Sequence, residues 1–169
     1  MLRVDLGQLD REGSVDVEAS ISAEDELWKE TDLGWTEDVS VTLRAMFAGT
    51  GEVVARGNVH GTLRQECRRC LQPVETPFES DLTLVFVSEG SDADEESGAY
   101  AFESKGSELE LGEAVREELL LAINPYVVCN PECKGLCPRC GTNLNDGSCG
   151  CTESEVDPRW GALRDLKSE

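Results

Sequence analysis

The sequence predicts an α+β protein: a curled antiparallel β-sheet, barrel-like or sandwich-like, packed against one main helix and followed by a cysteine-rich, zinc-stapled module. Three observations support this. Hydrophobic and polar residues alternate through the middle of the chain, one stretch carries a helical apolar stripe, and six of the eight cysteines fall between Cys129 and Cys151. Because 169 residues suit one core with a small appendage, we expect a β-rich domain over residues 1–124 and a metal module over residues 125–169.

Short strands are expected near the start of the chain, at residues 2–6 and 15–19, where apolar and polar residues alternate. A longer strand follows at residues 39–47, and Gly49 and Gly51 then supply a turn. The side chains expected on the inner face of this strand are Val39, Val41, Leu43, Ala45 and Phe47.

Two further strands are expected at about residues 53–63 and at residues 74–86. Small residues on the inner face of the first of these strands suggest a bend or a close-packed neighbour. Cys67 and Cys70 lie between the two strands, so a metal knuckle can take the place of an ordinary hairpin turn.

The next segment, residues 88–106, is rich in Ser, Gly, Asp and Glu and has little apolar surface to offset the entropy of ordering. We therefore expect a mobile acidic loop. It is either a solvated excursion of the chain or a surface that attracts a basic partner.

The clearest helix is expected at about residues 108–123, where apolar residues recur at helical spacing and Asn124 and Pro125 then end the helix. Its stripe comprises Leu111, Ala114, Val115, Leu119 and Ala122, and the buried face is expected to widen to Leu120, Leu121 and Ile123. Near the end of the chain, Asp157 and Pro158 are typical of a helix start. The short docking helix predicted there has an apolar stripe of Trp160, Leu163 and Leu166, which we expect to pack on the protein's own core.

The eight cysteines divide into two sets of four, the number that closes a tetrahedral zinc shell. The first predicted site comprises Cys137, Cys140, Cys149 and Cys151. The second comprises Cys67, Cys70, Cys129 and Cys133, which would pin the segment after the helix onto the hairpin. An alternative grouping stays open, in which Cys129 and Cys133 share a metal with Cys137 and Cys140.

Zinc is the expected metal, with two ions per chain, although the spacing does not separate zinc from iron held by four cysteines. A thiol redox pair would need a helix start in a βαβ setting, and neither Cys-x-x-Cys pair has one. Disulfides are the least favoured alternative, because cytosolic thiols stay reduced. A closed four-thiolate shell has no open position for a substrate, so these metals are expected to hold structure.

The balance of 35 acidic against 15 basic residues gives a formal net charge of −20. Such a field repels phosphate backbones and attracts basic proteins, so a basic protein is the expected partner. We expect no membrane contact and no small-molecule substrate. Because no signal peptide or membrane-spanning stretch is evident, the expected location is the cytoplasm.

Direct contact with RNA is the alternative, through Arg68, Arg69, Arg139 and Trp160. The arginines could equally offset thiolate charge. No catalytic residue is predicted: His60, the single histidine, lies on the outer face of an expected strand, and no phosphate-binding loop or catalytic triad can be assembled.

Several motifs together resemble the YceD family, the large ribosomal RNA subunit accumulation proteins of bacteria and plastids. They are Cys67-Arg-Arg-Cys70-Leu71, the run from Cys133 to Asn145, Cys149-Gly-Cys151, and the segment from Asp157 to Leu166. The resemblance implies a role in the synthesis, processing or stability of 23S ribosomal RNA, and hence in large-subunit assembly. It does not imply a known enzymatic activity. With the resemblance, the expected basic partner is a ribosomal or rRNA-processing protein, and the RNA of the alternative is ribosomal RNA.

Overall fold

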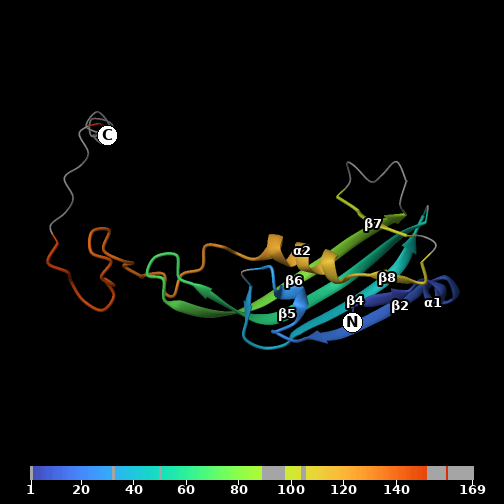
Figure 1. The fold of residues 1–169 in the computed structure, drawn as a ribbon, viewed down its shortest axis with the longest axis horizontal. Helices are drawn as coiled ribbons and strands as arrows, with labels where there is room; N and C mark the ends of the chain where they lie inside the picture. The colour runs from blue at the N-terminus through green and yellow to red at the C-terminus, as the bar shows by residue number, and fades with distance from the viewer. Residues whose placement is uncertain are drawn as a thin grey trace.

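A long antiparallel hairpin, β5 and β6, forms the centre of the molecule (Figure 1). The computed structural model describes residues 2–31, 33–49, 51–88, 98–103, 106–151 and Arg159. Its elements are β1 (Arg3–Asp5), α1 (Leu6–Glu12), β2 (Ser14–Ile21), the 3₁₀ helix η1 (Glu26–Trp28), β3 (Gly34–Trp35), β4 (Val39–Ala48), β5 (Glu52–Glu66), β6 (Pro73–Ser88), β7 (Tyr100–Phe102), β8 (Glu108–Glu110) and α2 (Gly112–Ala122).

The main sheet has six strands in the order β2-β4-β5-β6-β7, and β3 pairs with β5 outside this path. All its pairs are antiparallel except β6 with β7, so the sheet is mixed rather than purely antiparallel. Among the described residues the edge strands β2 and β7 do not pair with each other. The α+β class is confirmed, whereas the sheet is open and closure into a barrel is not confirmed.

The hydrophobic core lies on one face of β4, β5 and β6, as their alternation predicts. Val41, Val59 and Leu84 are almost completely buried there with Leu119 of α2, and Figure 1 shows α2 along this side of the long strands. Phe47 is 42% exposed, so its predicted inward position is wrong. It lies near the end of β4, although Val53, its partner on β5, is fully buried.

Glycines at positions 57 and 61 of β5 make room for close neighbours, as their small size predicts. A Cβ atom on Gly57 would collide with the carbonyl oxygen of Thr42, and one on Gly61 would lie 2.8 Å from the ring of Trp35. Trp35 is also 5.6 Å from Trp28 and 5.6 Å from Phe78, measured between ring centroids. The indole of Trp35 therefore extends the core over the part of β5 that β4 does not reach.

Three local predictions need correction near the helices. Leu6 starts α1 rather than continuing a strand, because the carboxylate of Asp5 accepts a hydrogen bond from Gln8 N (2.7 Å) and caps the helix. The main helix begins at Gly112 rather than near residue 108, since residues 108–110 form β8 and pair with β1.

The third correction concerns the last turn of α2. Leu120 and Leu121 are 41% and 81% exposed, although both were expected to be buried, and Ala122 is also exposed. Leu119 is fully buried, and each following residue turns about 100° around the helix axis, so its two successors point away from the sheet.

Two predicted segments fall largely or wholly outside the described residues. The acidic loop of residues 88–106 is described only at residues 88, 98–103 and 106, and the docking helix with Trp160 is not described except at Arg159. Within the described part of the chain, no helix is long and apolar enough to cross a membrane.

Candidate metal centres

The tip of the β5–β6 hairpin is a tight knuckle that carries Cys67 and Cys70. Cys67 N donates to Gln72 O (2.8 Å), and Leu71 N donates back to Cys67 O (2.9 Å). This closure places Leu71 in the left-handed region at φ 59°. The knuckle holds both thiols on the same side of the turn, facing the segment that follows α2.

A second knuckle of the same construction carries Cys137 and Cys140. Cys137 N donates to Thr142 O (2.8 Å), and Gly141 N donates to Cys137 O (2.9 Å). Gly141 has φ 72°. The two six-residue turns therefore share their backbone hydrogen bonds and differ in carrying leucine or glycine at the left-handed position.

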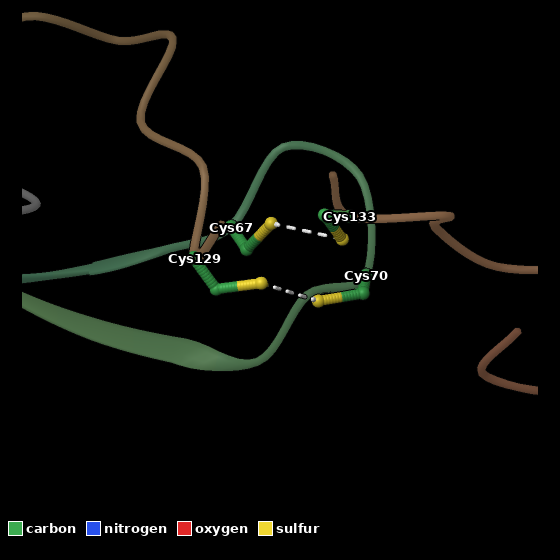
Figure 2. Close-up of side chains that lie close together, drawn as sticks. All are labelled: Cys67, Cys70, Cys129 and Cys133. Carbon is green, nitrogen blue, oxygen red and sulfur yellow. Dashed lines mark hydrogen bonds between the residues drawn. The ribbon is translucent and has the colours of Figure 1, made fainter. Parts of the chain in front are cut away.

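Four sulfur atoms converge at the hairpin knuckle, those of Cys67, Cys70, Cys129 and Cys133 (Figure 2). All four lie within 4.8 Å of one another. The Sγ atoms of Cys67 and Cys133 are 3.9 Å apart, and those of Cys70 and Cys129 are 3.5 Å apart. Tetrahedral coordination with metal–sulfur bonds of about 2.3 Å places the sulfurs about 3.8 Å apart, so this set fits a metal ion.

The sulfur atoms of Cys137, Cys140, Cys149 and Cys151 form the other cluster and also lie within 4.8 Å of one another. The two clusters thus contain the two sets of four that the spacing suggests, and each could hold a metal ion. They differ in exposure. Three cysteines are buried at the hairpin cluster, whereas only Cys137 is buried at the C-terminal cluster.

Arg69 ties the cysteine segment to the hairpin knuckle. Its Nη1 donates to Pro131 O (3.0 Å) and Cys133 O (2.9 Å). Its own carbonyl oxygen accepts from Leu136 N (3.0 Å). These bonds fix the backbone that carries Cys133, so Arg69 has a structural role at the cluster.

Arg68 contacts the chain that leaves α2. Its backbone N donates to Val127 O (2.9 Å), while its guanidinium lies 5.6 Å from the ring centroid of Tyr126. Gln65 Nε2 donates to Asn124 O (3.1 Å). The chain that leaves α2 is therefore held along the hairpin before it reaches the first of its cysteines.

Two polar side chains that the sequence had not singled out contact the sulfurs. Asn145 Nδ2 donates to the sulfur of Cys133 (3.3 Å), and its Oδ1 accepts from Lys134 N (2.8 Å). Thr142 Oγ1 lies 3.2 Å from the sulfur of Cys140. Asn145 links the clusters, because it belongs to the loop of the C-terminal set and contacts the hairpin set. Spacing alone gave no sign of this contact.

The thiols of each cluster have divergent pKa values because neighbouring thiolates cannot all ionise in so small a space. Backbone N–H groups, first that of Cys129, lower the pKa of Cys67 to about 6, while proton sharing with Cys70 raises that of Cys129 to about 12. At the other cluster Thr142 lowers the pKa of Cys140 to about 6, and Cys140 raises that of Cys151 to about 12. A divalent cation would stabilise all four thiolates together.

The structure describes three of the four residues predicted to contact RNA. Arg68 and Arg69 share the hairpin knuckle but face different partners, and exposed Arg139 belongs to the other knuckle. Trp160 lies outside the described residues. Tyr126, which the sequence had not singled out, is the aromatic side chain beside Arg68.

Comparison with known proteins gives a family match. The model of the YceD family, described as large ribosomal RNA subunit accumulation protein, matches residues 55–167, which include all eight cysteines. An uncharacterized protein of Mycobacterium tuberculosis is 33% identical over 140 residues, which is 80% of this chain and 64% of that protein. The chain thus spans less than two thirds of that relative's length.

Plant relatives carry an informative name. The large ribosomal RNA subunit accumulation protein YCED homolog 1, chloroplastic, of Arabidopsis thaliana is 31% identical over 108 residues, covering 58% of this chain and 34% of that protein. The Zea mays protein of the same name is 41% identical over 56 residues, covering 32% of this chain and 19% of its own length. No solved structure matches the chain.

Proposed function

Because this chain belongs to the YceD family of large ribosomal RNA subunit accumulation proteins, we propose that it supports the accumulation of 23S ribosomal RNA and hence large-subunit assembly. The observation that carries the proposal is the extent of the match, which runs through both cysteine clusters. The plant relatives named for this role support it.

We propose further that the chain acts through protein contacts and without catalysis. Its formal charge of −20 opposes a polyanion such as RNA and favours a basic ribosomal or rRNA-processing protein. His60, its single histidine, is exposed on β5 and contacts Asn58 and, more distantly, Glu79. Four-cysteine sites leave no position for a substrate, which supports a structural role for the clusters.

The proposed metal is zinc, with one ion in each cluster. Soft thiolate ligands suit zinc, and the donors Asn145 and Thr142 resemble the outer contacts that orient metal-bound ligands. A zinc ion at the hairpin cluster would cross-link the hairpin to the cysteine segment that follows α2. Iron suits four thiolates equally well in geometry, and visible absorption of the purified protein separates the two metals.

Direct binding of RNA is the second candidate function, and one observation favours it. Tyr126 is 71% exposed with the guanidinium of Arg68 over its ring, and exposed aromatic rings beside arginine can stack with unpaired bases. The acidity of the chain makes this the less favoured proposal.

Depletion in the organism that encodes the chain tests the proposed function. The ratio of 23S to 16S ribosomal RNA should fall on depletion and recover with the wild-type chain. His60→Ala should restore it fully if no catalysis depends on that side chain, whereas Cys67→Ser should restore it poorly. An unchanged ratio after depletion would contradict the proposal.

A further inference from the structure

A small pocket lies where β2 ends, beside η1, β8 and the start of α2. Its volume is about 240 Å³, which is below the roughly 300–1,000 Å³ of pockets that hold drug-sized ligands. A pocket of this size suits a single side chain. Its lining includes Leu2, Ile21, Asp25, Leu27, Glu110 and Gly112, and we refer to it as the η1 pocket.

Apolar side chains form the walls of the η1 pocket. Leu2 and Ile21 belong to the hydrophobic core, and Leu27 packs against the same core. Gly112 leaves room at the start of α2, because a Cβ atom added there would lie 3.5 Å from Leu27 Cδ1, an ordinary van der Waals distance. A long side chain that enters the pocket can therefore bury its methylene groups against apolar surface.

The charged side chains that line the η1 pocket are acidic. Among the described lining residues, Asp25 and Glu110 carry carboxylates and none carries a positive charge. Asp25 Oδ1 accepts a hydrogen bond from Leu27 N (3.0 Å), and Glu110 Oε1 lies 2.6 Å from Arg3 Nε. Because the two oxygens of a carboxylate offer about four acceptor sites, each of these groups can accept further hydrogen bonds. Both can therefore bind an incoming cation.

The surroundings of the η1 pocket add to its negative charge. Exposed acidic side chains flank the lining residues along the chain: Glu24, Glu26 and Glu113. Arg3 is already paired with Glu108 and Glu110. Lys29, which follows η1, is paired with Glu26. The local charge thus has the same sign as the formal charge of −20, and both favour a cationic occupant.

We propose that the η1 pocket receives a lysine or arginine side chain of a basic protein partner. The methylene groups of that side chain would pack against Leu2, Ile21 and Leu27, and its cationic head would lie beside Asp25 and Glu110. This inference rests on the proposed function, since it names the site at which the chain would hold a basic protein of the large subunit.

Binding to the proteins extracted from purified large ribosomal subunits tests this site. The immobilised full chain, loaded with zinc, should retain one or more basic proteins, which mass spectrometry identifies. Asp25→Asn combined with Glu110→Gln should weaken their retention roughly tenfold, as expected when contact residues are removed, while asparagine can still cap η1. The matched control, Glu79→Gln combined with Asp81→Asn, removes the same charge from exposed side chains of β6 and should have little effect.

Gly112→Met tests the η1 pocket without changing a charge, because the added side chain would extend beside Leu27 and fill the pocket. It should weaken retention of the same proteins roughly tenfold and keep the metal content of the wild type. If this variant does not fold, the two pairs of charge substitutions decide the question alone.

The outcomes that contradict the η1 pocket differ from those that contradict the proposed function. Equal losses in the control pair and in the pair at Asp25 and Glu110 would show that only net charge matters. That result, or full retention by a folded Gly112→Met chain, would overturn the pocket and leave the protein-contact proposal standing. No retention by the wild type would overturn both. If Gly112→Met instead abolishes binding of naked 23S ribosomal RNA, the pocket serves RNA and the docking proposal is wrong.

Discussion

A different side chain contacts a sulfur of each cluster, so a substitution can perturb one cluster at a time. Asn145 donates to a sulfur of the hairpin cluster, and Thr142 contacts a sulfur of the C-terminal cluster. Outer contacts of this kind orient ligands and typically change metal affinity by about 10- to 100-fold when they are removed. A variant of Asn145 and a variant of Thr142 can therefore each serve as the control for the other.

Asn145→Ala is expected to weaken metal binding at the hairpin cluster by about tenfold or more, because Cys133 loses its N–H donor. Thr142→Val should do the same at the C-terminal cluster through Cys140. Competition with a chromogenic chelator measures the affinity of each site. Identical losses at both clusters from either variant would show that the contacts do not act locally.

Alanine substitutions at two glycines with positive φ separate the effect of backbone strain from the effect of a steric collision. Gly141→Ala should lower the free energy of unfolding by about 1–2 kcal/mol, because no atom lies within 4 Å of the added Cβ and only strain remains. Gly135→Ala should lower the free energy of unfolding by more, since its Cβ would lie 2.9 Å from Arg69 O. That oxygen accepts one of the hydrogen bonds by which Arg69 holds the cysteine segment. Chemical denaturation of the metal-loaded protein measures both, and equal losses would contradict the collision.

The sequence predicted how the eight cysteines group into two sets but not the contacts that support them. Spacing places two thiols on each tight turn, so local pairs such as Cys137 and Cys140 are readable from the chain. The roles of Arg69 and Asn145 arise from residues distant in sequence that meet only after folding. They were therefore beyond prediction from spacing.

The hairpin and the cysteine segment form a unit at the scale of elements. Figure 1 shows the cysteine segment, coloured orange to red, at and beyond the tip of the β5–β6 hairpin. They are connected by the hydrogen bonds of Arg69 to Pro131 and Cys133 and by the hairpin cluster, to which both contribute cysteines. The order of the segment after α2 should therefore depend on cysteines more than 50 residues earlier in the chain.

Cys67→Ser tests this dependence. It should loosen residues 125–133 while leaving the cluster of Cys137, Cys140, Cys149 and Cys151 loaded, because the two clusters share no cysteine. Amide hydrogen exchange measures the loosening, and metal analysis measures the remaining ion. The matched control is Cys137→Ser, which should leave residues 125–129 protected. Protection lost in the hairpin alone would contradict a shared ion.

Strong alternation made the long strands predictable, whereas short and irregular elements were missed. Residues 39–47 and 74–86 appear within β4 and β6, because one face of each is buried. The strand β3 and the helix α1 have too few residues for a pattern to emerge. The parallel pairing of β7 depends on long-range contacts, and the exposure of Leu121 depends on where α2 leaves the sheet.

At the scale of the whole molecule, the acidity and the cysteine clusters act together. Each four-thiolate site that binds a divalent cation adds about −2 to a formal charge of −20. With metal bound at both clusters, the chain would attract basic proteins even more strongly. The cysteine segment after α2 would be held to the sheet mainly by the hairpin cluster. With zinc at both clusters as proposed, metal loading would support both the fold and the proposed function.

Elemental analysis of the full chain purified under reducing conditions tests this account most directly. Two zinc ions per chain are expected for the wild type, and one is expected for Cys67→Ser or for Cys137→Ser, because each variant disrupts a single cluster. Chelation should then abolish the order of the cysteine segment. A fully folded wild-type chain that contains no metal would contradict the account.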